Sequence, residues 1–263
     1  MKKAFTVLLT FAILFGSCFA AYRTIHDLWR EFGYGLIDHT RGEMLVHAYA
    51  EANDLRYTDY PEELIALLDR NPETSAYVLE YPFRRGQTEH YDITEYKESA
   101  SVPLFMQWDQ RWGYITYGDG PAGLTACGPI CLSMVGYYLT EDPKFAPERI
   151  MEFSMDNGYC IPGNGTAWTL ISEGAVRLGL EVTELPLHEN TIISNLEAGW
   201  PIICIMGPGD FTSTGHYIVL TGYENGAFRV NDPNSYKNSE QLWTYEQIES
   251  QIRNLWVLKA YGT

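Results

Sequence analysis

The 263-residue sequence contains few cysteines, and they are spread along the whole chain. Five cysteines are too few for a domain held together mainly by disulfides. They form no C-x-x-C pair, and the chain has no H-x-x-x-H pattern, so the usual spacings of a zinc site are missing. The protein must therefore fold around an apolar core, for which 46% hydrophobic residues are sufficient at this length. The cysteines are Cys18, Cys127, Cys131, Cys160 and Cys204.

Basic residues are also scarce, since 18 lysines and arginines stand against 34 acidic residues, a formal net charge of −16. Such a surface repels nucleic-acid phosphates and anionic lipid headgroups. The sequence has no G-x-x-x-x-G-K-[ST] loop and no internal repeat. We therefore exclude nucleic acid and anionic membrane surfaces as expected partners.

Long hydrophobic runs are absent as well. The apolar run at 4–15 is shorter than the roughly 20 residues needed to span a bilayer. It follows Lys2 and Lys3 and leads into small residues with an A-x-A-like site near Ala20. This pattern is typical of a secretory signal peptide over residues 1–20. We expect an exported, extracellular protein with no integral membrane span after leader removal.

Cys18 leaves a second mode of export open. Lipoprotein signals also place small residues before a cysteine that carries the lipid anchor. Phe15, however, stands where such signals prefer an aliphatic residue. The sequence therefore favours soluble secretion over attachment to the cell surface through Cys18.

Residues 21–100 carry the signals of several short helices. Helix starts are indicated at Pro61 and at Asn71-Pro72-Glu73, each ahead of an apolar pattern, and Pro82 is expected to close the second helix. The polar stretch at 84–101 is predicted to be a linker. The segment is either an inhibitory pro-segment or a helical brace. The brace is favoured because no cleavage signal stands out.

Residues 101–263 change from helical to strand patterns along the chain. Asn225-Gly226 is a strong hairpin signal between two of the strands. Helices followed by antiparallel strands predict an α+β domain. We expect helices over about 128–140, 166–178, 190–198 and 245–252, and strands over 201–206, 216–220, 228–231 and 255–259.

Cys127 is the candidate nucleophile, because it stands at the start of the first of these helices. Unpaired N–H groups and the helix dipole favour a thiolate there. Cys131 lies one turn further and is predicted to be core, and Cys204 lies within an apolar strand. Cys160 is predicted to lie in a loop and remains a weaker rival.

His216 and Asp232 are the candidate base and orienting residue. His216 enters a strand after the loop at 207–215, whose small residues leave room for a substrate. Asp232 follows the hairpin's return strand and could accept the far N–H of His216. Asp232 could also serve only in a turn, because Asn-Asp-Pro-Asn is turn chemistry by itself. The chain order is then nucleophile, base and orienter, as a thiol hydrolase requires.

Acyl transfer also needs hydrogen-bond donors for the developing oxyanion. The backbone N–H of Cys127 can supply one donor. Gln107 or Gln110 could supply a second through the side-chain amide, and the residues alone do not choose between them.

Five motifs occur in one order over about 101–259: Q-W-D-Q-R-W-G at 107–113, C-G-P at 127–129, G-T-A-W at 165–168, G-H-Y at 215–217 and N-D-P at 231–233. Together they resemble papain-like cysteine peptidases related to the bacteriocin-processing, double-glycine leader peptidases. The resemblance implies a papain-like fold with Cys127 as nucleophile, His216 as base and Asp232 as orienter. It also implies that Gln107, rather than Gln110, lies in the oxyanion hole, and that no metal or organic cofactor is needed.

The chain departs from this family in two respects, and these limit which of the family's properties we expect here. The processing peptidases are fused to membrane transporters and act inside the cell, so cleavage after double glycine is not expected here. The longer papain signature C-G-[SA]-C-[WY] also fails at Pro129 and Ile130. We expect a secreted cysteine peptidase acting on peptide or protein substrates. The alternatives are an amidase or thioester hydrolase acting on cell-wall peptides or other amides, and a non-catalytic extracellular binding module.

Overall fold

The computed structural model describes residues 40–87 and 89–262. The predicted signal peptide and Cys18 lie outside the described residues. Residues Gly42–Thr263 form one compact unit. Among the described residues, no helix is both long and apolar enough to cross a membrane.

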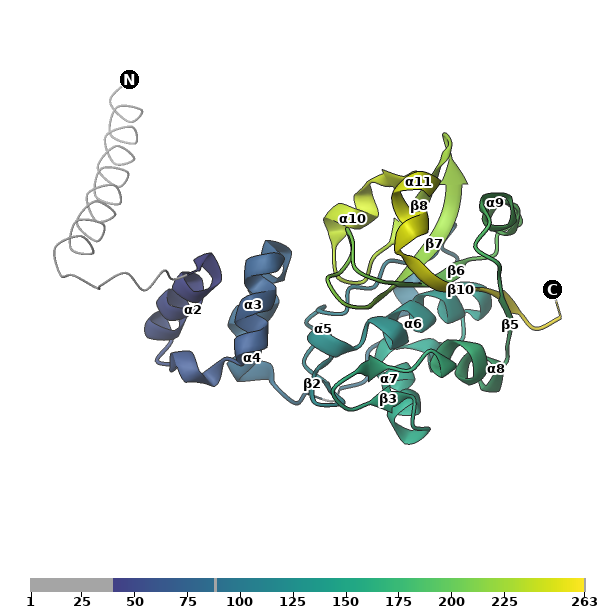
Figure 1. Ribbon diagram of the computed structural model, residues 1–263. Helices are drawn as coiled ribbons and strands as arrows, with labels where there is room; N and C mark the ends of the chain where they lie inside the picture. The colour runs from purple at the N-terminus through teal and green to yellow at the C-terminus, as the bar shows by residue number, and fades with distance from the viewer. Residues whose placement is uncertain (1–39, 88, 263) are drawn as a thin grey trace, which may run out of the picture. The chain divides into compact units, whose positions relative to one another are not determined.

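A six-stranded antiparallel sheet forms the centre of this unit (Figure 1). Its strand order is β5-β10-β6-β7-β8-β9. The predicted hairpin is confirmed: Asn225 and Gly226 have φ values of 52° and 81° and join β7 to β8, with Glu224 opposite Ala227. The strands are β5 (Leu180–Glu184), β6 (Ile202–Met206), β7 (His216–Glu224), β8 (Ala227–Asn231), β9 (Leu242–Trp243) and β10 (Ile252–Ala260).

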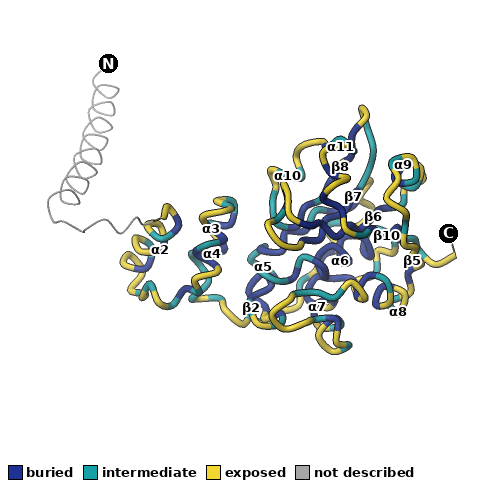
Figure 2. The backbone as a smooth tube through the Cα atoms, viewed as in Figure 1, coloured by how far each residue is buried: buried dark blue, intermediate teal, exposed yellow. Residues whose placement is uncertain are grey.

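Helices cover both faces of the sheet, and α6 (Cys127–Thr140) is the most deeply buried of them. Ile203 and Ile205 of β6 face the core that contains α6, whereas Cys204 and Met206 face the opposite core. This alternation buries every residue of β6. Figure 2 shows the buried backbone concentrated in these central elements. The α+β prediction is confirmed.

The remaining helices of this region lie in layers around α6 and the sheet. The core on the α6 side also takes side chains from α7 (Pro147–Asp156) and from η5 (Leu170–Gly174), a π-helix that continues as α8 (Ala175–Arg177). The opposite core takes side chains from α9 (Glu189–Glu197) and α11 (Tyr245–Ile248). The shorter elements are β1 (Thr116–Tyr117), β2 (Gly120–Pro121), α5 (Ala122–Thr125), η4 (Pro143–Phe145), β3 (Cys160–Ile161), β4 (Gly165–Thr166), α10 (Tyr236–Glu240) and η6 (Glu249–Gln251).

The helix expected over 166–178 begins later than predicted. Thr166 lies in β4 and pairs with Cys160 of β3, and the helical turns start at Leu170. Gly165 takes φ +76°, a left-handed conformation that keeps the chain out of a helix at this point. The predicted end is right, because Gly179 (φ +87°) follows the last turn.

Three helices precede the sheet domain: α2 (Arg41–Ala52), α3 (Glu62–Arg70) and α4 (Ser75–Arg84). The prediction that Pro82 closes a helix is wrong, because Pro82 lies inside α4. The helix continues past it, and the Arg85 N–H still donates to the Tyr81 carbonyl at 2.9 Å. Proline removes only one bond in this last turn, which explains why it is tolerated. Short 3₁₀ segments are η1 (Tyr57–Asp59), η2 (Pro72–Thr74) and η3 (Thr94–Tyr96).

The N-terminal helices share a core with the following region. Val46, Leu64 and Tyr77 cluster with Met106 and Tyr114. The Tyr77 hydroxyl donates to the Gly113 carbonyl at 2.9 Å, and the Tyr114 hydroxyl donates to the Tyr77 carbonyl at 3.0 Å. The helices are therefore packed into the same compact unit as the sheet.

The stretch predicted as a linker also contributes to this packing. Ile93 is 1% exposed and belongs to the core around α6. One buried apolar side chain within a polar segment gives no periodic signal, and for this reason the sequence pattern did not show the packing.

Candidate functional site

Cys127 is the first residue of α6 and is half-buried. The start of a 14-residue helix supplies unpaired N–H groups and the positive end of the helix dipole. The next residue must be small, because a Cβ at Gly128 would lie 2.8 Å from Cγ2 of Thr166. Gly128 thus lets β4 approach the helix start directly beside the thiol.

His216 is the first residue of β7, and Asp232 directly follows β8. The two strands are neighbours in the sheet, with Val219 opposite Asn231, and this register brings the two side chains together. His216 Nε2 lies 2.7 Å from Asp232 Oδ1. Both side chains are buried, at 6% and 1% exposed. Since Nε2 is engaged by Asp232, Nδ1 is the ring nitrogen left for the thiol.

The electrostatics couple the thiol of Cys127 to the ring of His216. Burial by itself raises the pKa of Cys127, but the hydrogen bond and charge of His216, together with backbone N–H groups of Tyr217 and Gly128, bring this pKa below its usual value. Burial lowers the pKa of His216, and the charge and hydrogen bond of Asp232 outweigh it, raising the pKa to about 10. Both pKa shifts favour a thiolate beside an imidazolium over the neutral pair.

Asp232 has more partners than sequence reasoning supplied. Its Oδ1 also accepts the Asn234 N–H at 2.9 Å, a short-range contact typical of an aspartate in a turn. Its Oδ2 accepts Nδ2 of Asn238 at 2.8 Å. Asp232 therefore makes the turn contact and the histidine contact together. Asn238 was missed; the available signal was Ser235, whose hydroxyl caps α10 by accepting the Asn238 N–H.

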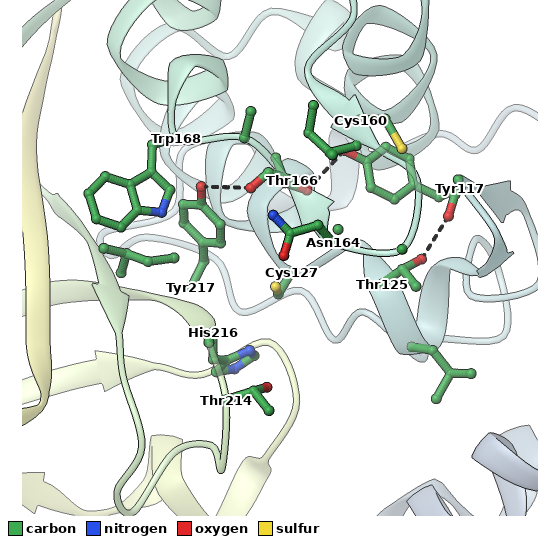
Figure 3. A pocket seen from close by; sticks show the side chains of 18 of the residues that line it. Tyr117, Thr125, Cys127, Cys160, Asn164, Thr166, Trp168, Thr214, His216 and Tyr217 are labelled. Atoms are coloured by element: carbon green, nitrogen blue, oxygen red, sulfur yellow. Dashed lines mark hydrogen bonds between the residues drawn. The ribbon is translucent and has the colours of Figure 1, made fainter.

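A cavity of about 1130 Å³ opens over Cys127 and His216 (Figure 3). Its volume exceeds the roughly 300–1,000 Å³ of small-molecule sites, which leaves room for several residues of an extended peptide. One wall comes from segments around β1–β2 and β3–β4, and the other from β6, β7 and the loop between them. Side chains that line it include Trp168, Tyr217, Met206, Asn164, Thr214 and Arg253.

Gln107, the predicted oxyanion donor, is 4% exposed and is not among the described residues that line the cavity. Its backbone N–H donates to the Pro233 carbonyl at 2.7 Å, next to Asp232. Its Nε2 donates to the Gly123 carbonyl at 2.8 Å, and its buried Oε1 has no hydrogen-bond partner among the described residues. Gln110 instead accepts from Nη1 of Arg84 at 2.9 Å. Of the two glutamines, only Gln107 contacts the segment that carries the orienter.

The other three cysteines of the described residues have less reactive surroundings, and all four thiols are free. Cys160 lines the cavity, and the prediction of a loop is wrong because Cys160 lies in β3. Burial raises the pKa of Cys160, of Cys131 and of Cys204. Only Cys127 has a lowered pKa among them.

We expect iodoacetamide at about pH 6 to label Cys127 at least about ten times faster than Cys131, Cys160 or Cys204, because only the thiolate reacts. Site-resolved mass spectrometry of the labelled protein gives the four rates. Labelling in urea serves as the control, since unfolding removes the environments that distinguish the thiols. Fastest labelling at Cys160 would contradict the assignment.

A cysteine at a helix start facing a histidine on an antiparallel sheet is the arrangement of papain-like proteins. The chain belongs to the Peptidase_C39 like family, which matches residues 99–261. Among solved structures, the chain is similar to the peptidase domain of Streptococcus ComA, a bi-functional ABC transporter involved in a quorum-sensing pathway. The two share 21% identity and a TM-score of 0.42, over 60% of this chain and 98% of that one.

A second similar structure is a protein of Bacillus anthracis with a provisional C39-like peptidase assignment. It shares 16% identity and a TM-score of 0.41, over 62% of this chain and 96% of that one. No curated protein sequence matches the chain.

Proposed function

We propose that the protein is an exported cysteine peptidase that acts through Cys127, His216 and Asp232. The observation that carries this proposal is the 2.7 Å contact between His216 Nε2 and Asp232 Oδ1. The same ring is hydrogen-bonded to the thiol of Cys127 at a helix start. Family membership supports peptidase-type chemistry. Export is supported by the leader pattern at 1–20.

In the acylation step, the Cys127 thiolate attacks the carbonyl carbon of a substrate amide. The negative charge moves to the carbonyl oxygen, where the Cys127 N–H and the side-chain amide of Gln107 are the proposed donors. The carbon–nitrogen bond then breaks, and the His216 imidazolium gives its proton to the leaving amine. The products of this step are a thioester on Cys127, a free amine and a neutral imidazole.

In the deacylation step, the neutral His216 takes a proton from a water molecule that attacks the thioester carbonyl. The carbon–sulfur bond breaks, the carboxylic acid product leaves and the thiolate–imidazolium pair returns. Asp232 takes no proton in either step: it holds the Nε2–H so that Nδ1 faces the thiol, and it stabilises the charged ring.

The proposal is tested by incubating the purified protein with a diverse library of unmodified peptides and identifying new termini by mass spectrometry. Cleavage of internal peptide bonds supports a peptidase. Hydrolysis of only simple amides, thioesters or cell-wall peptides would favour the amidase or thioester hydrolase over a peptidase. No hydrolysis, together with slow labelling of Cys127, would favour the binding module.

The pH dependence of kcat/KM follows from the two pKa shifts. The reactive pair requires Cys127 to be deprotonated and His216 to be protonated, so activity rises through the lowered thiol pKa and falls as His216 loses its proton near its raised value of about 10. We expect a bell-shaped profile whose two limbs belong to the coupled pair. Initial rates on an uncharged peptide from about pH 4 to about pH 11 check this. Activity that only begins to rise near pH 8.5, the usual pKa of a free thiol, would contradict the lowered thiol pKa.

A further inference from the structure

The orienting carboxylate of Asp232 lies on an irregular segment between β8 and β9, not on a strand. Its two carboxylate oxygens contact different residues. Oδ1 contacts His216 at 2.7 Å and accepts the Asn234 N–H at 2.9 Å, and Oδ2 accepts from Nδ2 of Asn238 at 2.8 Å. A carboxylate with only one oxygen held can turn about its terminal bond. The Asn238 contact therefore holds the second oxygen and, with the Asn234 N–H on Oδ1, keeps Oδ1 facing the histidine.

Asn238 is in turn held through both its backbone N–H and its backbone carbonyl. Its N–H donates to the Ser235 hydroxyl at 3.2 Å, and its carbonyl accepts Nε1 of Trp243 at 2.9 Å. Asn238 belongs to α10, which has only five residues. A helix this short is marginal by itself, so its position depends on what it contacts.

The contacts at the start of α10 come from the N-terminal helical segment. Glu73 of η2 accepts the Tyr236 N–H with Oε2 at 2.9 Å and the Lys237 N–H with Oε1 at 3.0 Å. These N–H groups lie in the first turn, where no helical carbonyl can pair with them. One carboxylate therefore satisfies two donors of a helix that is more than 160 residues away along the chain.

Further contacts hold the segment between Asp232 and α10 in place. Nδ2 of Asn71 and Nε1 of Trp108 both donate to the Asn234 carbonyl, the latter at 3.0 Å. The Trp108 ring also lies edge-on to the Tyr236 ring, with centroids 5.4 Å apart. Residues that follow Asp232 are thus fixed from outside the sheet.

We propose that Glu73 and Asn238 are positioning residues for the catalytic centre. Glu73 holds α10, α10 presents Asn238, and Asn238 orients Asp232 toward His216. This inference rests on the proposed function. It assigns the N-terminal segment a specific part in catalysis through Glu73. This residue lies before the region 99–261 that matches the family.

The test compares Glu73→Ala and Asn238→Ala with the wild type in two assays: the pH profile of Cys127 alkylation, and kcat and KM for peptide hydrolysis. We expect alkylation at about pH 6 to fall about tenfold in Asn238→Ala, since a hydrogen bond to a charged group is lost, and about three- to tenfold in Glu73→Ala. The acid limb of the alkylation profile should move to higher pH. For peptide hydrolysis, kcat should fall with little change in KM. Glu51→Ala, an exposed change in α2, is the matched control.

A general loss of stability is separated from positioning in two ways. Glu73→Gln keeps an acceptor oxygen for α10 and should recover part of the alkylation rate. In the double variant, Glu73→Ala should add little to Asn238→Ala, because both act through one contact. Fully additive effects, or an unchanged alkylation profile in Glu73→Ala, would overturn the proposal. If the wild type cleaves no peptide, the proposed function fails, yet the alkylation profiles still decide whether Glu73 positions the pair.

Discussion

Replacing Cys127 with alanine is expected to reduce peptide hydrolysis by about 10⁴-fold or more, to the level of residual binding and oxyanion effects. No other described thiol can take over, because burial raises the pKa of each of the other three. The measurement is kcat/KM on the best peptide from the library, with the thermal melting curve recorded beside it. A folded Cys127→Ala protein with wild-type activity would refute the assigned nucleophile.

Cys160→Ala is the matched control for this result. Cys160 lines the same cavity and is also a free thiol, but burial raises its pKa, whereas His216 lowers that of Cys127. We expect this variant to keep activity within a few-fold of the wild type. If Cys160→Ala is inactive and Cys127→Ala is active, the rival cysteine is the nucleophile.

Replacing His216 with alanine is expected to produce a loss of similar size by removing the base, the acid and the charge that lowers the thiol pKa. Two measurements check it: peptide hydrolysis should fall by about 10⁴-fold, and Cys127 alkylation at about pH 6 should become as slow as that of the other cysteines. Loss of hydrolysis with unchanged alkylation would mean that His216 does not activate the thiol.

The His216 change also leaves the buried Asp232 carboxylate without its cation, which is expected to cost about 3–5 kcal/mol of unfolding free energy. His216→Gln therefore accompanies it, because its amide can still donate to Asp232 while supplying no base. His188→Ala, at an exposed position, is the control and should leave both rates unchanged. Retained activity in His216→Gln would contradict the role of the ring.

Much of the sheet domain could be predicted from local patterns. The helix at Cys127–Thr140, the apolar strands and the Asn225-Gly226 turn agree closely with prediction, because each depends on neighbouring residues. β5 and α7 were not predicted. β5 is half exposed along its length and lies at the edge of the sheet, so its apolar pattern is weak.

Two of the errors have their origin in contacts between separate segments, and the error at Pro82 is local. Pro82 remains helical because only one bond is lost near the helix end, and Thr166 is extended because β3 pairs with it. Ile93 is buried within a polar stretch by the core around α6. For Thr166 and Ile93, contacts with other segments decided the outcome.

By itself, the sequence determined the residue types of the proposed site and their order, Cys127, His216 and Asp232, together with the elements that begin or end at them. These are local properties, set by helix starts, turns and strand periodicity. Only the tertiary structure decided which nitrogen of His216 meets Asp232, how Gln107 is held, and that Glu73 and Asn238 support the carboxylate. Such contacts join residues up to about 160 positions apart, and their geometry is fixed by strand register and packing, which no local pattern encodes.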